Sequence, residues 1–449
     1  METAARKKRA LVLGGGGSRG AYEIGVWQAL REMDWQFDIV TGTSVGSING
    51  AIFATGEFDV AVEVWKKLDN SMVFNVELDE SVDMKTKTAL VLKKLAGDMV
   101  KTGGGDGARL RELLTTYIDE EKVRKSPVNY GLATVDISEM KLCEMTKEEI
   151  PEGKLVDYIL ASASIFPAVR PQKIDTQTYV DGGLFEQMPI DLAIRMGAED
   201  IIAIELDGTG LFHKTAPEGV RERLLKPKWD LGSVFVFDTA QVGRSMRFGY
   251  LDGMKLFGVF DGEYYAFIKN TWLPLFKARR AKFNKLCDAC AVNPTAGYRG
   301  FLEKKASDSL KNALRQRGVS GTKYESVMLC AAELCGEIFG LDPTVIYSAE
   351  RFTERLEEKV IGYSVEIRKV LRRQKNGLPE MLKMLSRELR TVILARLLTN
   401  NLNSGKPYSF APMATLMPNE FLAALFVATV INNDVYAEKE NALLQECGE

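Results

Sequence analysis

Apolar and polar positions follow two different patterns in the two parts of this chain. Up to about residue 285, short apolar runs rich in Val, Ile and Leu are separated by helical patterns. The runs typical of strands cover residues 10–13, 37–40, 131–137, 141–145, 178–182 and 201–206. Between the first two runs, Tyr22, Val26, Leu30 and Met33 recur at helical spacing. This alternation predicts an α/β layer fold with a mostly parallel central sheet.

Charged helical patterns prevail beyond about residue 285, where strand-like runs are few. They cover residues 306–317, 324–340, 351–360 and 380–398. With 449 residues, 46% of them hydrophobic, the chain is long enough for more than one core. We therefore expect two domains, an α/β domain over residues 1–285 and a mainly α-helical C-terminal domain over residues 286–449, for which the sequence suggests no role.

The charge balance and the apolar runs limit the classes of protein to consider. A formal net charge of -2 argues against a dedicated nucleic-acid binder, which needs a basic surface. The longest apolar block, residues 421–431, is shorter than the roughly 20 residues that a membrane-spanning helix requires. The basic N-terminus lacks the apolar stretch of a signal peptide. We therefore expect a cytoplasmic protein, with peripheral contact at the inner membrane surface left open.

The six cysteines include one C-x-x-C pair, Cys287 and Cys290. No second pair with zinc-type spacing and no nearby histidine completes a metal site. We interpret these cysteines as reduced structural thiols and expect no metal.

A glycine-rich turn follows the first apolar run and precedes the first helical pattern. Gly15, Gly17 and Gly20 match G-x-G-x-x-G, which occurs where a helix N-terminus binds the pyrophosphate of a dinucleotide. The same backbone N–H groups also suit an oxyanion hole. A dinucleotide site predicts an acidic residue near the end of the second strand, whereas Asp38 lies at its beginning, which disfavours a dinucleotide site.

A serine between two glycines occurs twice. Ser44, between Gly42 and Gly46, comes after an apolar run and before a helical pattern, as in a nucleophile elbow. The second match, residues 16–20, contains Ser18 within the glycine turn, where a serine side chain readily bonds to the local backbone. Context therefore favours Ser44 as a nucleophile.

A nucleophilic serine needs a base, and the chain contains one histidine, His213, in a loop-like stretch. Asp181 is a second candidate, because it ends a short strand and precedes Gly182 and Gly183. An ordinary turn aspartate would have the same local sequence.

Three motifs in this order resemble those of the bacterial patatin-like phospholipases. They are GGGGSRG at residues 14–20, GTSVG at 42–46, and DGG at 181–183, which follows the segment ASASIFPAVRP. The resemblance covers about residues 8–210 and identifies residues 1–285 as the catalytic domain. It implies a serine lipid acyl hydrolase that acts on lipid or phospholipid esters without a cofactor.

The resemblance also assigns roles to individual residues. It implies a catalytic dyad in which Ser44 is the nucleophile and Asp181 the general base, so that His213 is left with a structural role. The oxyanion hole would come from the glycine turn, from the N–H groups of Gly15, Gly16 and Gly17 with Arg19 close by. Two alternatives remain at this stage: a nucleotide-binding protein, and a catalytically inactive membrane-associated protein of the same fold.

Residues 86–107 predict an amphipathic helix followed by a glycine run. Its apolar stripe comprises Leu92, Leu95, Ala96 and Met99, and its lysines are Lys87, Lys93, Lys94 and Lys101. The glycines at 103–105 would allow the segment to swing. Such a helix fits a lid or membrane contact beside Ser44. The same pattern is also typical of an ordinary surface helix packed on the core. The sequence leaves both hypotheses open.

Overall fold

The computed structural model of the chain describes residues 6–206, 217–290, 307–321, 323–363, 366–367, 370, 378–404 and 410–431. The chain forms two compact units that divide between Phe257 and Gly258. The domain boundary expected at residue 285 falls inside the helix Trp272–Cys290, so the first unit ends earlier than the sequence pattern indicated.

The first unit contains an eight-stranded sheet. Its strands are β1 (Arg9–Leu13), β2 (Ile39–Thr43), β3 (Asn129–Asp136), β4 (Lys141–Thr146), β5 (Gln172–Ile174), β6 (Gln177–Asp181), β7 (Asp200–Ile204) and β8 (Arg221–Leu225). The order is β5-β6-β3-β2-β1-β7-β8, and β4 pairs with β3. The pairings from β3 through β8 along this order are parallel, while β4, β5 and β6 pair antiparallel. The expected α/β fold with a mostly parallel central sheet is confirmed.

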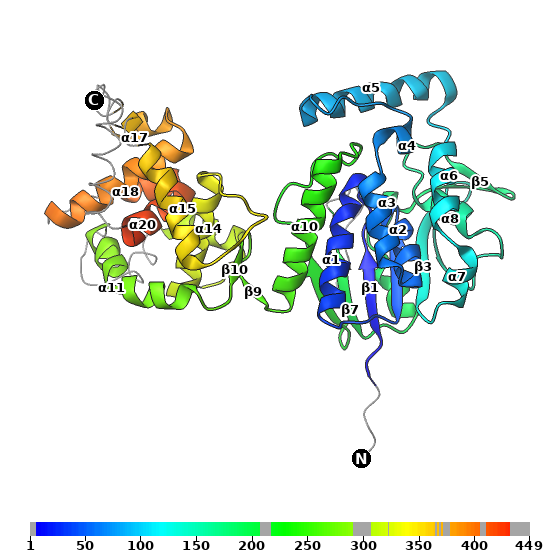
Figure 1. The fold of residues 1–449 in the computed structure, drawn as a ribbon, viewed down its shortest axis with the longest axis horizontal. Coiled ribbons are helices and arrows are strands. Elements are labelled where there is room, and N and C mark those ends of the chain that lie inside the picture. The colour runs from blue at the N-terminus through cyan, green and yellow to red at the C-terminus, as the bar shows by residue number, and fades with distance from the viewer. Residues whose placement is uncertain are drawn as a thin grey trace, which may run out of the picture. The chain divides into compact units, whose positions relative to one another are not determined.

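Helices cover both faces of this sheet (Figure 1). They are α1 (Ala21–Glu32), α2 (Val45–Thr55), α3 (Phe58–Lys67), α4 (Asn70–Phe74), α5 (Met84–Thr102), α6 (Ala108–Tyr117), α7 (Glu120–Lys125), α8 (Leu155–Ser162), α9 (Ile190–Arg195) and α10 (Thr239–Leu256). Two short 3-10 turns, η1 (Gly17–Gly20) and η2 (Gly182–Leu184), follow β1 and β6.

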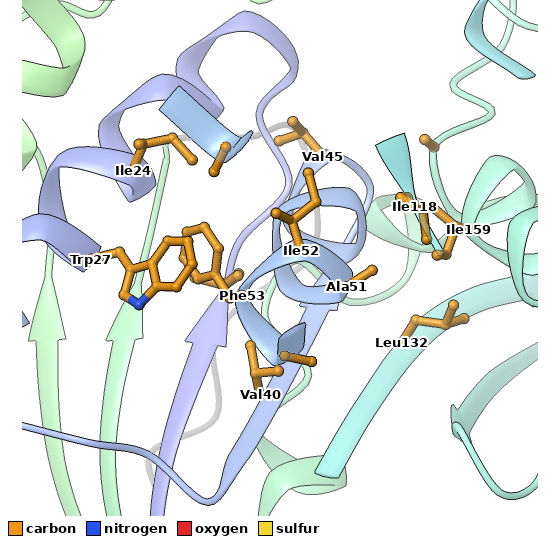
Figure 2. Close-up of a cluster of buried hydrophobic side chains, with 14 of the residues drawn as sticks. Ile24, Trp27, Val40, Val45, Ala51, Ile52, Phe53, Ile118, Leu132 and Ile159 are labelled. Atoms are coloured by element: carbon orange, nitrogen blue, oxygen red, sulfur yellow. The ribbon is translucent and has the colours of Figure 1, made fainter. Parts of the chain in front are cut away.

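Strand β1 shows why this sheet needs two helical layers. Its side chains alternate between the faces: Leu11 and Leu13 pack in the larger core with α1, α2, α8 and α10, and Ala10 and Val12 pack against α9 on the other face. A strand buried on both sides reads as a continuous apolar run, as residues 10–13 do. In the larger core, Trp27 of α1 and Phe53 of α2 stack with ring centroids 4.0 Å apart (Figure 2).

The second unit is mainly helical, as the sequence pattern predicted. Its helices are α11 (Trp272–Cys290), α13 (Ser307–Gln316), α14 (Tyr324–Ile338), α15 (Ala349–Gly362), α17 (Leu378–Lys383), α18 (Arg387–Ser404), α19 (Ala411–Leu416) and α20 (Pro418–Val430). A small sheet, β9 (Phe260–Asp261), β10 (Ala266–Ile268) and β11 (Ile346–Tyr347), completes it. Cys287 and Cys290 are buried in α11, and burial raises the pKa of both thiols, as expected for structural cysteines.

Candidate active site

A sharp turn between β2 and α2 presents Ser44. The residue has φ 55° and ψ −127°, a backbone conformation unfavourable for a side chain, and α2 begins at the next residue. The flanking glycines permit the turn, because a Cβ at Gly42 would lie 2.1 Å from the Gly46 carbonyl oxygen and a Cβ at Gly46 would lie 2.5 Å from the Leu13 carbonyl oxygen. The turn thus has the geometry of a nucleophile elbow.

The strand register brings Asp181 to the level of Ser44. Thr43 of β2 is aligned with Ala133 of β3, and the next residue, Thr134, is aligned with Asp181 at the end of β6. The Ser44 hydroxyl donates a hydrogen bond of 2.7 Å to Asp181 Oδ2. Two residues that are far apart in sequence therefore form a direct serine–carboxylate pair.

Asp181 is buried, with 3% of its surface exposed. Burial raises the pKa of Asp181 to about 6, against the opposing effect of hydrogen bonds from the Ser44 hydroxyl and the Gly183 N–H. The carboxylate is thus ionised at neutral pH and a stronger base than a solvated aspartate. This is the partial desolvation that a serine–aspartate dyad needs.

A serine that the sequence analysis did not single out supports the nucleophile. The Ser162 hydroxyl accepts a hydrogen bond of 3.0 Å from the Ser44 backbone N–H and donates one of 2.7 Å to the Ala133 carbonyl. Ser162 ends α8 and is completely buried. The serine-rich start of ASASIFPAVRP was the available signal, but nothing local in that segment indicates which backbone it contacts.

The glycine turn lies against the elbow, since a Cβ at Gly15 would be 3.3 Å from the Ser44 Cβ. The three backbone N–H groups expected to form the oxyanion hole differ in whether they already have a hydrogen-bond acceptor. The Gly15 N–H donates to the Gln187 carbonyl at 3.1 Å, which directs it away from the role expected for it. For the N–H groups of Gly16 and Gly17, by contrast, the part of the chain that the structure describes shows no acceptor.

Arg19 and Ser18 hold the turn in place. The Arg19 guanidinium donates to the carbonyls of Gly232 and Leu206, and the Ser18 hydroxyl donates to the Ser233 carbonyl. The Arg19 side chain therefore anchors the glycine turn to two backbone carbonyls, and its expected place beside the oxyanion hole stays a prediction. Ser18 is buried, in agreement with the choice of Ser44 over Ser18.

The remaining motif glycines lie at close contacts around these elements. A Cβ at Gly20 would lie 2.7 Å from Val45 Cγ2, and one at Gly182 would lie 2.3 Å from the Ala133 carbonyl oxygen. Gly183 donates its N–H to Asp181 Oδ1 at 2.7 Å. These glycines thus support the packing of the site.

Ser44 and Asp181 open into a cavity of about 140 Å³ with mostly apolar walls. The glycine turn and Gln187 also line it. The apolar lining residues are Val45, Ile48, Ile52, Val64, Trp65, Leu68, Val73, Phe74, Leu110, Leu113, Ala163, Ile165, Val169, Leu184, Val234, Phe235 and Phe237. A hydrocarbon chain fits such walls, since its transfer from water is favourable.

A buried polar cluster joins the glycine turn to the elbow helix. Asn49 of α2 donates to the Gly20 carbonyl and to Glu23 Oε2, and accepts from the Trp65 indole N–H. Burial raises the pKa of Glu23 to about 8, so this carboxyl group is protonated at neutral pH. The cluster fixes α1 against α2 beneath the cavity.

The histidine, a metal site and a membrane-spanning helix were also considered from the sequence. His213 lies outside the described residues. Among those described, no group of three or more His, Cys, Asp or Glu side chains has the arrangement of a metal site, and no helix is long and apolar enough to cross a membrane.

Asp38 precedes β2 at the strand end opposite Ser44, where Arg6 and the Arg9 N–H bind its carboxylate. The nucleotide alternative therefore lacks its acidic residue.

Fold and site together define an α/β protein with a buried serine–aspartate pair. Residues 11–194 match the family model described as patatin-like phospholipase. This part of the chain is thus similar to the patatin-like phospholipases.

The relatives come from animals and bacteria. Patatin-like phospholipase domain-containing protein 7 of Rattus norvegicus is 28% identical over 335 residues, which are 72% of this chain and 23% of that protein. An uncharacterised NTE family protein of Mycobacterium tuberculosis is 26% identical over 44% of this chain and 49% of its own length. The chain thus spans about a quarter to a half of these relatives. The resemblance is confirmed for the family, while the relatives do not single out its bacterial members.

Two solved structures align over most of the chain with low similarity. VipD from Legionella pneumophila has a TM-score of 0.35 and 14% identity, covering 96% of this chain and 92% of VipD. The ExoU chain from Pseudomonas aeruginosa, in complex with SpcU, has a TM-score of 0.32 and 14% identity, covering 97% and 90%. Both TM-scores are too low to support a structural argument about this chain.

Proposed function

We propose that the protein hydrolyses carboxylic esters of lipids through a serine-ester intermediate. The observation that carries this proposal is the 2.7 Å hydrogen bond from the Ser44 hydroxyl to the buried Asp181 carboxylate, at an apolar cavity. The names of the relatives, patatin-like phospholipases, support a phospholipid or related lipid as the substrate class. A cytoplasmic location stays a prediction from the sequence.

In the acylation step, Asp181 accepts the proton of the Ser44 hydroxyl as the oxygen attacks the ester carbonyl carbon. The carbonyl π bond breaks, and its electron pair forms the oxyanion of a tetrahedral intermediate. The N–H groups of Gly16 and Gly17 stabilise this oxyanion, a contribution of roughly 3 kcal/mol for one donor. The intermediate collapses, the alcohol leaves with the proton from Asp181, and the acyl group stays on Ser44.

In the deacylation step, water takes the place of the alcohol. Asp181 accepts a proton from the water as it attacks the acyl carbon, and returns that proton to Ser44 when the carboxylic acid leaves. Neither step requires a histidine or a cofactor.

The apolar cavity supports an acyl chain rather than a polar group as the bound part of the substrate. Its few polar groups, Ser44, Asp181, Asn49 and Gln187, lie among many aliphatic and aromatic walls. Such a cavity aligns the ester carbonyl with Ser44 while the chain is buried.

The test compares fatty-acid release from a phospholipid and from a short-chain nitrophenyl ester. We expect the wild type to release acid from both, and Ser44→Ala to lose activity by several orders of magnitude. Ser18→Ala is the matched control, because it also removes a serine hydroxyl from a G-x-S-x-G match, while Ser18 bonds to the Ser233 carbonyl and does not line the cavity. Turnover that persists in Ser44→Ala would contradict the mechanism, and turnover of the short ester alone would contradict the lipid assignment.

The inactive-protein alternative is less consistent with the site. It requires a damaged dyad, whereas both members of the pair are present and within hydrogen-bond distance. Loss of all ester turnover in the wild type would favour it.

A further inference from the structure

Helix α5 packs on the wall of the cavity through one face only. Val91 and Leu95 are buried there, in a small apolar cluster that includes Phe74, Ile165 and Phe235. Those last three residues also line the cavity beside Ser44. Lys87 lies on the same inward face, where it is buried and paired with Asp238. The helix is thus fixed to the site by its inward face.

The outward face of α5 is unusually apolar. Leu92, Met99 and Val100 are 46%, 48% and 88% exposed, and Ala96 is exposed between them. Positions 92, 96, 99 and 100 share one side of a helix. Of the stripe expected from the sequence, only Leu95 packs inward, so the stripe does not serve as the packing face.

Lysines without acidic partners accompany these apolar side chains. Helix α5 has five lysines and one aspartate, a net charge of +4. Lys94 pairs with Asp98, and Lys87 is buried. Lys85, Lys93 and Lys101 are exposed, and no ion pair to any of them is found among the described residues. The outward side of α5 therefore combines apolar area with free positive charge.

The loop after α5 is hydrogen-bonded to residues 167–170, a segment that includes Val169 of the cavity wall. The Gly105 N–H donates to the Pro167 carbonyl, and the Arg170 N–H donates to the Gly105 carbonyl. These two hydrogen bonds hold Gly105 in place, although the glycines at 103–105 were expected to act as a hinge. Phe166, which directly precedes residues 167–170, is 45% exposed. Leu184, which ends η2, is 52% exposed and lines the cavity. Figure 1 shows α5 across one end of the first unit, above α4.

We propose that the outward face of α5, together with Phe166 and Leu184, docks on an anionic lipid bilayer. Apolar side chains enter the interface while the lysines contact anionic headgroups, and the two contributions add. A membrane fits this surface better than a protein, because the lysines lie among the apolar side chains and the helix packs on residues that line the cavity. This inference deepens the proposed function by assigning the surface from which the lipid enters, and it rests on that function only for that consequence.

Binding is measured separately from catalysis. The full chain carrying Ser44→Ala is sedimented with vesicles of phosphatidylcholine and phosphatidylglycerol, and with vesicles of phosphatidylcholine alone. We expect binding to the anionic vesicles that weakens with added salt. On this background, Leu92→Gln with Val100→Gln, and separately Lys93→Glu with Lys101→Glu, should each lower the partition coefficient by about tenfold or more, since each removes one of the two contributions.

Two controls keep the result interpretable. Leu224→Gln alters an exposed leucine on the edge strand β8 and should leave vesicle binding unchanged. With Ser44 restored, the α5 variants should hydrolyse the short soluble ester at the wild-type rate, which shows that they fold. Vesicle binding that is absent, or equal in all variants, overturns the docking surface. Normal vesicle binding without any ester turnover in the wild type leaves this surface standing and rejects the proposed function.

Discussion

Replacing Asp181 by asparagine should remove activity while stabilising the fold. The site holds Asp181 as a buried carboxylate whose pKa is raised to about 6 from 3.8. Asparagine keeps the shape, can accept the Gly183 N–H, and can donate its amide to the Ser44 hydroxyl. It carries no charge, so the desolvation that disfavours ionised Asp181 disappears.

The expected stabilisation by Asp181→Asn, and the pH range over which it changes, follow from the difference between the folded-state and unfolded-state pKa of Asp181. Going from about 6 to 3.8 corresponds to about 3 kcal/mol in favour of the variant. Because the folded-state pKa is raised, the wild type carries this cost in full above pH 6, where Asp181 is ionised in both the folded and the unfolded state. The cost falls between pH 6 and 3.8, as the folded state takes up a proton first, and vanishes below that range.

Urea unfolding of the full chain provides the assay. Tryptophan fluorescence reports mainly on the first unit, which holds Trp27, Trp35, Trp65 and Trp229, whereas Trp272 lies in the second. We expect Asp181→Asn to unfold at higher urea than the wild type at pH 7.5, and the two midpoints to converge near pH 4. A variant less stable than the wild type at pH 7.5, by an amount that does not change with pH, would refute the reasoning.

Three further predictions concern the dyad and its support. The rate of ester hydrolysis at low substrate should fall tenfold per pH unit below about pH 6, as Asp181 becomes protonated, and a pH–rate profile measures this. Ser162→Ala should lower the turnover number about tenfold or more with little change in KM, because it frees the backbone of the nucleophile; steady-state kinetics test this. Glu23→Gln should already raise stability over the wild type at pH 7, with the gain complete above about pH 8 and absent below about pH 4.5, because wild-type Glu23 keeps its proton in the folded core up to about pH 8 but loses it near pH 4.5 when unfolded; urea midpoints at pH 4 and pH 8 decide it.

Much of the first unit could be predicted from the sequence because its signals are local. The apolar runs at 10–13 and 201–206 become β1 and β7, and the helical pattern at 21–33 becomes α1. Strands buried on both faces give continuous apolar runs, which are easy to recognise. The edge strand β8 was missed, since four of its five residues are at least partly exposed and its sequence, RERLL, is charged.

Only those site residues that belong to a sequence motif could be predicted. Ser44 and Asp181 belong to motifs, and the structure brings them into direct contact. The support of Ser162, the use of the Gly15 N–H by Gln187, and the anchoring of Arg19 all depend on contacts between distant segments. No periodicity or spacing encodes such contacts.

Helix α5 illustrates a different limit. Its apolar residues lie on both sides of the helix, with Val91 and Leu95 on one side and Leu92 and Val100 on the other. A helical pattern therefore predicts the helix correctly, while the choice of the buried side depends on which neighbours supply a partner surface. Those neighbours, Phe235 and Val236, come from more than a hundred residues further along the chain.

The identity of the nucleophile is tested most directly by labelling with a fluorophosphonate, which reacts with an activated serine. Intact mass and peptide mapping of the treated protein should show one adduct, located on Ser44, that is lost in Ser44→Ala and strongly reduced in Asp181→Asn. The adduct should persist in Ser18→Ala. An adduct that persists in Ser44→Ala and is lost in Ser18→Ala would contradict the account, as would the absence of any adduct on the wild type.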